Sequence, residues 1–204
     1  MPPTDASLSG IVLAAGAGTR HGGPKALVVP WLADAVRLLL DGGCGSVVVV
    51  LGAAADEARA LVPDDARVTC VVAPRWSDGL GASLRTGLAH ADGDAVVVTL
   101  VDLPGTPVSV VGRLTTTWDR STLRQAVYDG RPGHPVVIGA DHWAGLADTL
   151  TGDRGARGYL VAHGVEEVEC GDLHHGLDID EQSVSRPARS PRHAPTAPDQ
   201  GGTP

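Results

Sequence analysis

The segment from Leu13 to Lys25 combines small residues with basic side chains, and this combination can bind phosphate groups. Small residues let the backbone approach a ligand closely, and successive N–H groups can converge on phosphate oxygens. Arg20 and Lys25 add positive charge, and Lys25 is the only lysine in the chain. A compact ammonium group can follow charge as it moves between phosphorus centres, whereas the rigid fork of arginine suits a fixed geometry. The segment therefore favours a site for the phosphates of a nucleotide.

Two other interpretations of this loop remain open. Gly16, Gly18 and Gly22 could belong to the dinucleotide site of a dehydrogenase, because one glycine-rich loop after a strand is a weak signal. Such a site needs an acidic side chain near the end of the second strand, but that stretch reads Leu51-Gly52-Ala53-Ala54. A purely structural turn is the other interpretation. A P-loop is excluded, since the chain has no Gly-Lys-Ser or Gly-Lys-Thr triplet.

Three aspartates could hold a divalent metal beside these phosphates. Asp102 follows an apolar run at 95–101, which places it at the carboxyl end of a parallel strand, where open α/β sheets bind ligands. Its oxygens suit Mg²⁺, although an Asp-x-Pro turn that merely ends a strand gives the same pattern. Asp178 and Asp180 are separated by one residue, so both side chains point to one face of an extended segment. Solvated acids near a chain end explain that pair equally well.

The apolar pattern predicts which elements position these residues. Valine-rich runs alternate with helical spacing in the first half of the chain, and this order predicts right-handed crossovers in a doubly wound α/β sheet. The expected strands are 11–14, 47–51, 68–72, 95–101, 125–128, 135–138 and 166–170. The expected helices are 31–40, 54–61, 82–91, 109–118, 141–150 and 153–162.

Composition and charge narrow the class of protein. The 204 residues suffice for one domain, expected at 1–182 and followed by a flexible Pro-rich tail at 183–204. The net charge of -8 argues against a nucleic-acid partner or an anionic membrane surface. Three scattered cysteines make neither a disulfide framework nor a zinc cluster. Neither a leader nor a membrane span is visible, so a cytoplasmic location is expected.

Several ordered blocks resemble the MobA-like nucleotidyltransferases. The loop opens with Leu-Ala-Ala-Gly at 13–16, which is similar to the molybdenum cofactor cytidylyltransferases rather than to the guanylyltransferase branch. The segment Val28–Pro30 is shorter than the turn that such proteins usually have there. Further blocks in the family's order are Gly-Leu-Gly-Ala-Ser-Leu-Arg at 79–85, Val-Asp-Leu-Pro at 101–104, Gly-His-Pro-Val at 133–136, Gly-Asp-Arg-Gly-Ala-Arg at 152–157 and Asp-Ile-Asp at 178–180.

The resemblance implies a Rossmann-like nucleotidyltransferase fold with a mostly parallel sheet in three layers, and it implies roles for individual residues. Arg20, Lys25 and Asp102 would be catalytic. Asp102 and Asp180 would hold Mg²⁺, with Asp178 as a neighbour. His134 would contact the substrate. The nucleotide-binding set would be Leu13, Ala14, Ala15, Gly16, Gly18, Thr19, Arg20, Lys25 and Ser83.

Three arginines near these blocks have less specific roles. The block that contains Ser83 and Arg85 would lie near the base and ribose, although a simple helix cap explains it equally well. Arg154 and Arg157 are expected at the start of a helix and could attract an acceptor phosphate. A solvated helix face is an equally good interpretation of these last two side chains.

The implied activity is transfer of a nucleoside monophosphate, CMP from CTP, onto molybdopterin or the molybdenum cofactor with release of pyrophosphate. A partner enzyme could then take delivery of the product. Three alternatives stay open. The acceptor could be another phosphorylated small molecule, or the protein could be an NAD(P)H-dependent oxidoreductase, since some actinobacterial relatives of the family carry the name nicotine blue oxidoreductase. A nucleotide-binding protein without catalysis is the third, and the intact Lys25 and Asp102 argue against it.

Overall fold

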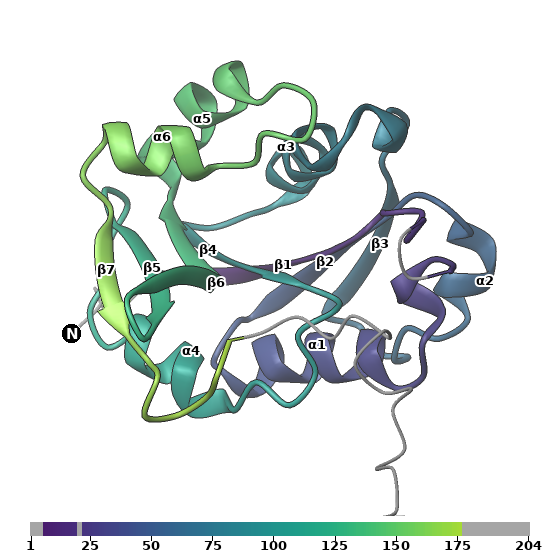
Figure 1. The fold of residues 1–204 in the computed structure, drawn as a ribbon, viewed down its shortest axis with the longest axis horizontal. Coiled ribbons are helices and arrows are strands. Elements are labelled where there is room, and N and C mark those ends of the chain that lie inside the picture. Colours follow the sequence, from purple (N-terminus) through teal and green to yellow (C-terminus); the bar gives the residue numbers. More distant parts are fainter. Residues whose placement is uncertain (1–5, 20–21, 177–204) are drawn as a thin grey trace, which may run out of the picture.

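One seven-stranded sheet forms the centre of the molecule (Figure 1). The computed structural model describes residues 6–19 and 22–176. The strands lie in the order β3-β2-β1-β4-β6-β5-β7. Their bounds are β1 Leu8–Ala14, β2 Ser46–Leu51, β3 Val68–Val72, β4 Ala95–Leu100, β5 Leu123–Tyr128, β6 Arg131–Gly139 and β7 Glu166–Glu169. The first four strands are mutually parallel, β6 is antiparallel to β4 and β5, and β7 is parallel to β5.

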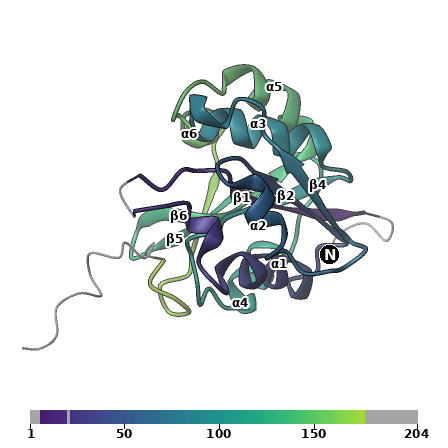
Figure 2. The same ribbon diagram turned by 90° about the vertical axis from the view of Figure 1, so that its right-hand side faces the viewer.

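Helices cover both faces of this sheet, so the fold has the three layers that we expected. Helices α3, α5 and α6 lie on one face, and α1 and α4 lie on the other (Figures 1 and 2). The α-helices are α1 Trp31–Asp41, α2 Ala55–Arg59, α3 Leu80–His90, α4 Val108–Leu114, α5 Trp143–Thr149 and α6 Arg157–Ala162. Short 3-10 helices are η1 Lys25–Leu27, η2 Trp76–Asp78 and η3 Ala140–His142. In the described part of the chain, none of the helices has the length and apolar character that a membrane crossing needs.

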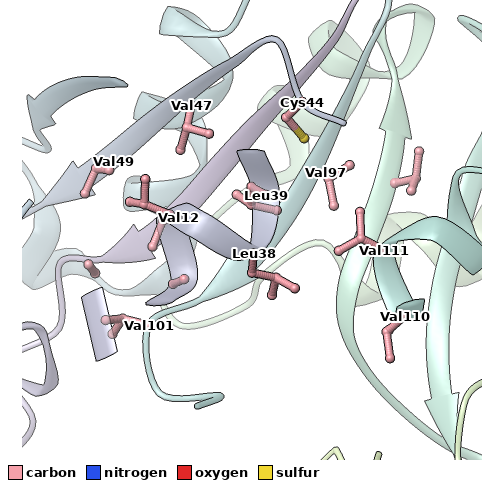
Figure 3. Packing of buried hydrophobic residues seen from close by; sticks show 14 of the residues in the cluster. Val12, Leu38, Leu39, Cys44, Val47, Val49, Val97, Val101, Val110 and Val111 are labelled. Atoms are coloured by element: carbon pink, nitrogen blue, oxygen red, sulfur yellow. The ribbon is translucent and has the colours of Figure 1, made fainter. Parts of the chain in front are cut away.

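Valine supplies most of the core because the central strands are buried on both faces. Along β2, Val47 and Val49 pack with residues of α1 (Figure 3), and Val48 and Val50 belong to a second cluster that includes residues of α3. Alternate side chains of a strand point to opposite faces, so continuous apolar runs fill two cores at once. The three cysteines are free thiols, and burial raises the pKa of Cys44 to about 12, which keeps that thiol protonated and unreactive.

The first half of the chain confirms the predicted elements to within a few residues, and the second half contains the errors. The helix expected at 153–162 begins only at Arg157, because Thr151 and Arg154 form an isolated bridge around Gly152, whose φ is 55°. The helix expected at 109–118 ends at Leu114. The Thr115 hydroxyl bonds back to a helical carbonyl there, which competes with continued helix. The expected tail at 183–204 lies outside the described residues.

The paired strands of the second half are longer than predicted. They run over 123–128 and 131–139, and they meet at a two-residue turn, Asp129-Gly130, whose φ angles are 51° and 72°. Two positive φ values define the tight hairpin turn that suits the twist of antiparallel strands. This hairpin inserts β6 beside β4 in the reverse direction and so makes the sheet mixed.

Candidate functional site

A cavity of about 560 Å³ opens at the carboxyl ends of β1 and β4. Open α/β sheets bind ligands at this end, outside the last residues of their parallel strands. One wall is the loop after β1, and the opposite wall is the start of α3 with the loop that precedes α6. The lining residues are Leu13, Ala14, Ala15, Gly16, Ala17, Gly18, Thr19, Lys25, Trp76, Ser77, Gly79, Leu80, Ser83, Leu100, Val101, Asp102 and Asp153.

Gly18 determines the shape of the glycine-rich loop. Its φ is 58°, a left-handed conformation that residues with a Cβ rarely adopt. The carbonyl oxygen of Gly18 accepts hydrogen bonds from the N–H groups of Gly22 and Gly23, at 3.0 and 3.1 Å. A Cβ at Gly18 would overlap the Gly23 carbonyl. The loop therefore closes on itself only with glycine at this position.

Lys25 and Asp102 meet at the floor of the cavity. Lys25 begins η1, just after the loop, and Asp102 follows β4. The Lys25 Nζ donates to Asp102 Oδ2 at 2.8 Å, and the two side chains are 18% and 16% exposed. Partial burial limits screening by water, so each group strongly affects the charge of the other. The structure thus brings together two residues that the sequence placed far apart.

The opposite wall joins two segments that are distant in the chain. The Gly81 N–H, in the first turn of α3, donates to the Gly152 carbonyl at 3.0 Å. Gly79 precedes α3 with a φ of 111°, and a Cβ there would collide with Gly152 and with the Asp153 carboxylate. Asp153 and Trp76 line the cavity, and sequence reasoning missed both as site residues. The Gly-Asp-Arg-Gly-Ala-Arg block could have pointed to Asp153. The predicted helix at 153–162 instead placed this residue on a helix, whereas the structure has it in a loop that lines the cavity.

The end of β2 packs tightly against the cavity. The Ala53 N–H donates to the Ala15 carbonyl at 3.0 Å, and a Cβ at Gly52 would overlap that same carbonyl and the Trp76 side chain. A dinucleotide site normally holds its ribose with an acidic side chain at this place. Gly52 and Ala53 provide no such group, and the segment instead supports the loop and Trp76.

The remaining predicted residues lie in different surroundings. Ser83 lines the cavity, but Arg85 donates to the carbonyls of Ala147 and Leu150 and so holds α5 to α3. His134 lies on β6, two residues before Val136, which pairs with Val98, so it sits alongside the end of β4; it is not among the residues that line the cavity. Arg20, Asp178 and Asp180 lie outside the described residues.

Tyr128 fixes the backbone at His134. Its hydroxyl donates to the His134 carbonyl at 2.7 Å, and the Gln125 Nε2 donates to the neighbouring Gly133 carbonyl at 3.0 Å. Burial raises the pKa of the Tyr128 hydroxyl, so it remains a protonated donor at neutral pH. Two side-chain hydrogen bonds therefore hold the backbone at this end of β6.

Asp102 is the carboxylate at the Lys25 end of the cavity that could serve a divalent cation. Within residues 6–19 and 22–176, no group of three or more His, Cys, Asp or Glu side chains could hold a metal ion. Mg²⁺ usually takes one or two carboxylates and completes its shell with water and substrate phosphates. Asp102 fits that pattern, because it lines the same cavity as the glycine-rich loop.

A model of the MobA-like NTP transferase domain matches residues 10–168. The chain belongs to this family. The family and its fold are those of nucleotidyltransferases, and the glycine-rich loop and Asp102 line one cavity at the carboxyl end of the sheet.

The chain is similar to a protein that is named as an oxidoreductase and to solved structures with the same fold. The chain is 40% identical over 191 residues to a nicotine blue oxidoreductase of Paenarthrobacter nicotinovorans, covering 85% of this chain and 92% of that protein. The crystal structure of Rv0371c from Mycobacterium tuberculosis H37Rv is 27% identical with a TM-score of 0.73, covering 87% of this chain and 94% of that one. Rv0371c was also solved in complex with manganese; this second structure has a TM-score of 0.67 and 27% identity and covers 81% and 89% of the two chains.

Similarity of fold extends to a more distant protein. A nucleotidyl transferase from Methanothermobacter has a TM-score of 0.76 at 24% identity, and the match covers 87% of this chain and 93% of that one.

Proposed function

We propose that the protein transfers CMP from CTP onto a phosphorylated acceptor, molybdopterin or the molybdenum cofactor, and releases pyrophosphate. The observation that carries this proposal is the pairing of Lys25 with Asp102 beside a loop that only glycine can close. That geometry puts the Lys25 ammonium group and the Asp102 carboxylate, a suitable oxygen ligand for a divalent cation, at one end of a single cavity. The opening Leu-Ala-Ala-Gly sequence supports CTP and a molybdenum-containing acceptor through its resemblance to the cytidylyltransferases.

The reaction needs charge stabilisation and positioning more than a protein nucleophile. An oxygen of the acceptor phosphate attacks the α-phosphorus in line, a new P–O bond forms, and the bond to the β-phosphate oxygen breaks with its electrons leaving on pyrophosphate. The loop N–H groups, Lys25 and Arg20 neutralise the triphosphate. A divalent cation, Mg²⁺ in this proposal, supplies further charge neutralisation when bound. Asp102 and Asp180 are the side chains that would hold it.

His134 and the arginines of the loop before α6 are assigned to the acceptor. His134 lies beside the end of β4, where an acceptor must approach the α-phosphorus, and Tyr128 holds its backbone in place. Arg157 begins α6 and Arg154 follows Asp153, which lines the cavity. We place the enzyme in the cytoplasm, where nucleoside triphosphates are made and used.

One observation favours a second function. The chain is 40% identical to the nicotine blue oxidoreductase, so the alternative is a reductase that binds NAD(P)H in the same cavity. The cavity argues against it, because Gly52 and Ala53 stand where a dinucleotide site places an acid, and a reductase has no role for the Lys25–Asp102 pair.

A thermal-shift comparison separates the two functions. The purified protein is melted with CTP, GTP, ATP or NADPH, each with and without Mg²⁺. The proposal expects stabilisation by CTP that increases with Mg²⁺. Stabilisation by NADPH alone, indifferent to metal, would overturn the transferase proposal in favour of the reductase.

The Lys25→Ala variant tests the mechanism in the same preparation. It is expected to keep its fold and to lose pyrophosphate release with CTP and acceptor, because the ammonium group that neutralises the triphosphate is removed. The exposed Arg59→Ala variant, on α2, removes one positive charge elsewhere and serves as its control. Unchanged turnover in Lys25→Ala would remove this residue from the mechanism.

A further inference from the structure

The end of the cavity away from Lys25 carries a polar group that the protein leaves unused. Ser83 is only 4% exposed, yet it lines the cavity, and no hydrogen bond joins its hydroxyl to another described residue. The Ser83 oxygen is not among the fully buried polar atoms that lack a partner, so this hydroxyl opens onto the cavity and can bond to a ligand there. Ser83 lies in the first turns of α3, an 11-residue helix, and Gly79 and Leu80 at the start of the same helix also line the cavity.

Asp153 shares this end of the cavity, and the backbone determines its place. The carboxylate lies directly against the Cα of Gly79, the residue before α3, in space that any Cβ would occupy. Gly152, immediately before it, accepts the hydrogen bond from the Gly81 N–H. The glycines at 79 and 81 therefore let the 151–154 loop pack against the start of the helix, with Asp153 in the wall of the cavity.

A carboxylate at this place has a restricted choice of ligand groups. Ionised aspartate only accepts hydrogen bonds, and it repels phosphate oxygens. Asp153 therefore faces a donor-bearing part of the ligand, while Lys25 and the loop face the phosphates. Cytosine presents an exocyclic amino group, whereas uracil presents a carbonyl oxygen in the same position. An acidic side chain attracts the first group and repels the second.

Resting on the proposed nucleotidyl transfer, we infer that Asp153 selects a nucleobase with an exocyclic amino group, cytosine over uracil, while the Ser83 hydroxyl donates to a ring carbonyl of the base. The glycine at 79 is required because it leaves room for both the carboxylate and the base edge. Asp153 is thus a specificity residue and takes no part in the transfer of the phosphoryl group.

Calorimetric titration of the full chain with CTP and with UTP, in Mg²⁺, tests this inference. The unchanged protein is expected to bind CTP about 10- to 100-fold more tightly than UTP, which is the range for one well-placed base contact. Asp153→Asn keeps the shape of the side chain and adds a hydrogen-bond donor. It should weaken the binding of CTP and strengthen the binding of UTP, so that UTP becomes the tighter ligand. Asp153→Ala should bring the two affinities together without reversal. Asp148→Asn, an exposed charge on α5, is the matched control and should change neither.

The outcomes distinguish this inference from the function on which it rests. Equal binding of CTP and UTP by the unchanged protein would overturn the inference and leave the transferase proposal standing. An equal loss of affinity for both nucleotides in Asp153→Asn would also overturn it, and would assign the carboxylate to the phosphate or metal end of the cavity. Failure of every triphosphate to bind would overturn both proposals.

Discussion

Replacement of Asp102 by asparagine separates its two effects on Lys25 and on the metal. The carboxylate now holds the Lys25 ammonium group at 2.8 Å, so a triphosphate must compete with Asp102 for the same cation. Asparagine keeps the size of the side chain and removes its charge. We therefore expect Asp102→Asn to bind CTP more tightly than the unchanged protein when divalent metal is absent, and to lose the increase in affinity that Mg²⁺ normally gives.

The size of this effect follows from the geometry of the pair. Two unit charges 2.8 Å apart attract by about 6 kcal/mol at an effective dielectric constant of 20. Desolvation opposes this attraction, and side chains that are 18% and 16% exposed lie between the surface pairs worth up to about 1 kcal/mol and the buried pairs that cost about 3–5 kcal/mol to break. A net value of about 1.4 kcal/mol corresponds to a tenfold change in affinity.

The assay is calorimetric titration of CTP in EDTA and again in Mg²⁺. Asp102→Asn should bind metal-free CTP about tenfold more tightly than the unchanged protein, and its two titrations should agree. Asp56→Asn removes an exposed charge from α2 and controls for the change in net charge. Equal or weaker metal-free binding by a folded Asp102→Asn variant would refute the idea that Asp102 restrains Lys25.

Four further variants test local features by urea unfolding. Gly18→Ala should destabilise the fold by about 1–2 kcal/mol and weaken CTP binding, because φ there is 58°; Gly112→Ala in α4, with open space around it, should instead stabilise by about 0.5–1 kcal/mol. Thr99→Val should raise the free energy of unfolding by about 1 kcal/mol, since the Thr99 hydroxyl is buried without a partner in the described part of the chain; a loss of stability would contradict this. Backbone N–H groups, Gly171 first, lower the pKa of Glu169, so its stabilisation is present above about pH 4.3 and disappears as pH falls through the folded-state pKa. Glu169→Gln should therefore flatten the acid limb of the stability curve, and an unchanged limb would refute this.

The strands of the first half were predictable because their chemistry is local. Runs such as 47–51 contain only Val and Leu, and a strand that is buried on both faces needs that composition. The strand at 131–139 was underestimated, since Pro132, Gly133 and Pro135 interrupt the apolar pattern. Its antiparallel place beside β4 depends on pairing between distant segments, which periodicity does not encode.

In the candidate site too, some residue positions follow from the sequence and others depend on contacts between distant segments. A loop after the first strand and an aspartate after the fourth place Lys25 and Asp102 at one end of a parallel sheet, so their proximity could be anticipated. Asp153 could not be found this way, because its position depends on the conformation of Gly79 and on a hydrogen bond between Gly81 and Gly152. Neither feature leaves a periodic signal in the sequence.

The hydrogen bond between Gly81 and Gly152 makes the ligand cavity a property of the whole folded chain. The end with Lys25 and Asp102 is built by the segments that follow the first and fourth strands, but the opposite wall exists only after the segment before α6 has docked on the start of α3. The proposed nucleotide, in contact with both ends, would link these segments as a crosslink does. We therefore expect bound nucleotide to protect the amide hydrogens of the segment before α6 from exchange as strongly as those of the glycine-rich loop.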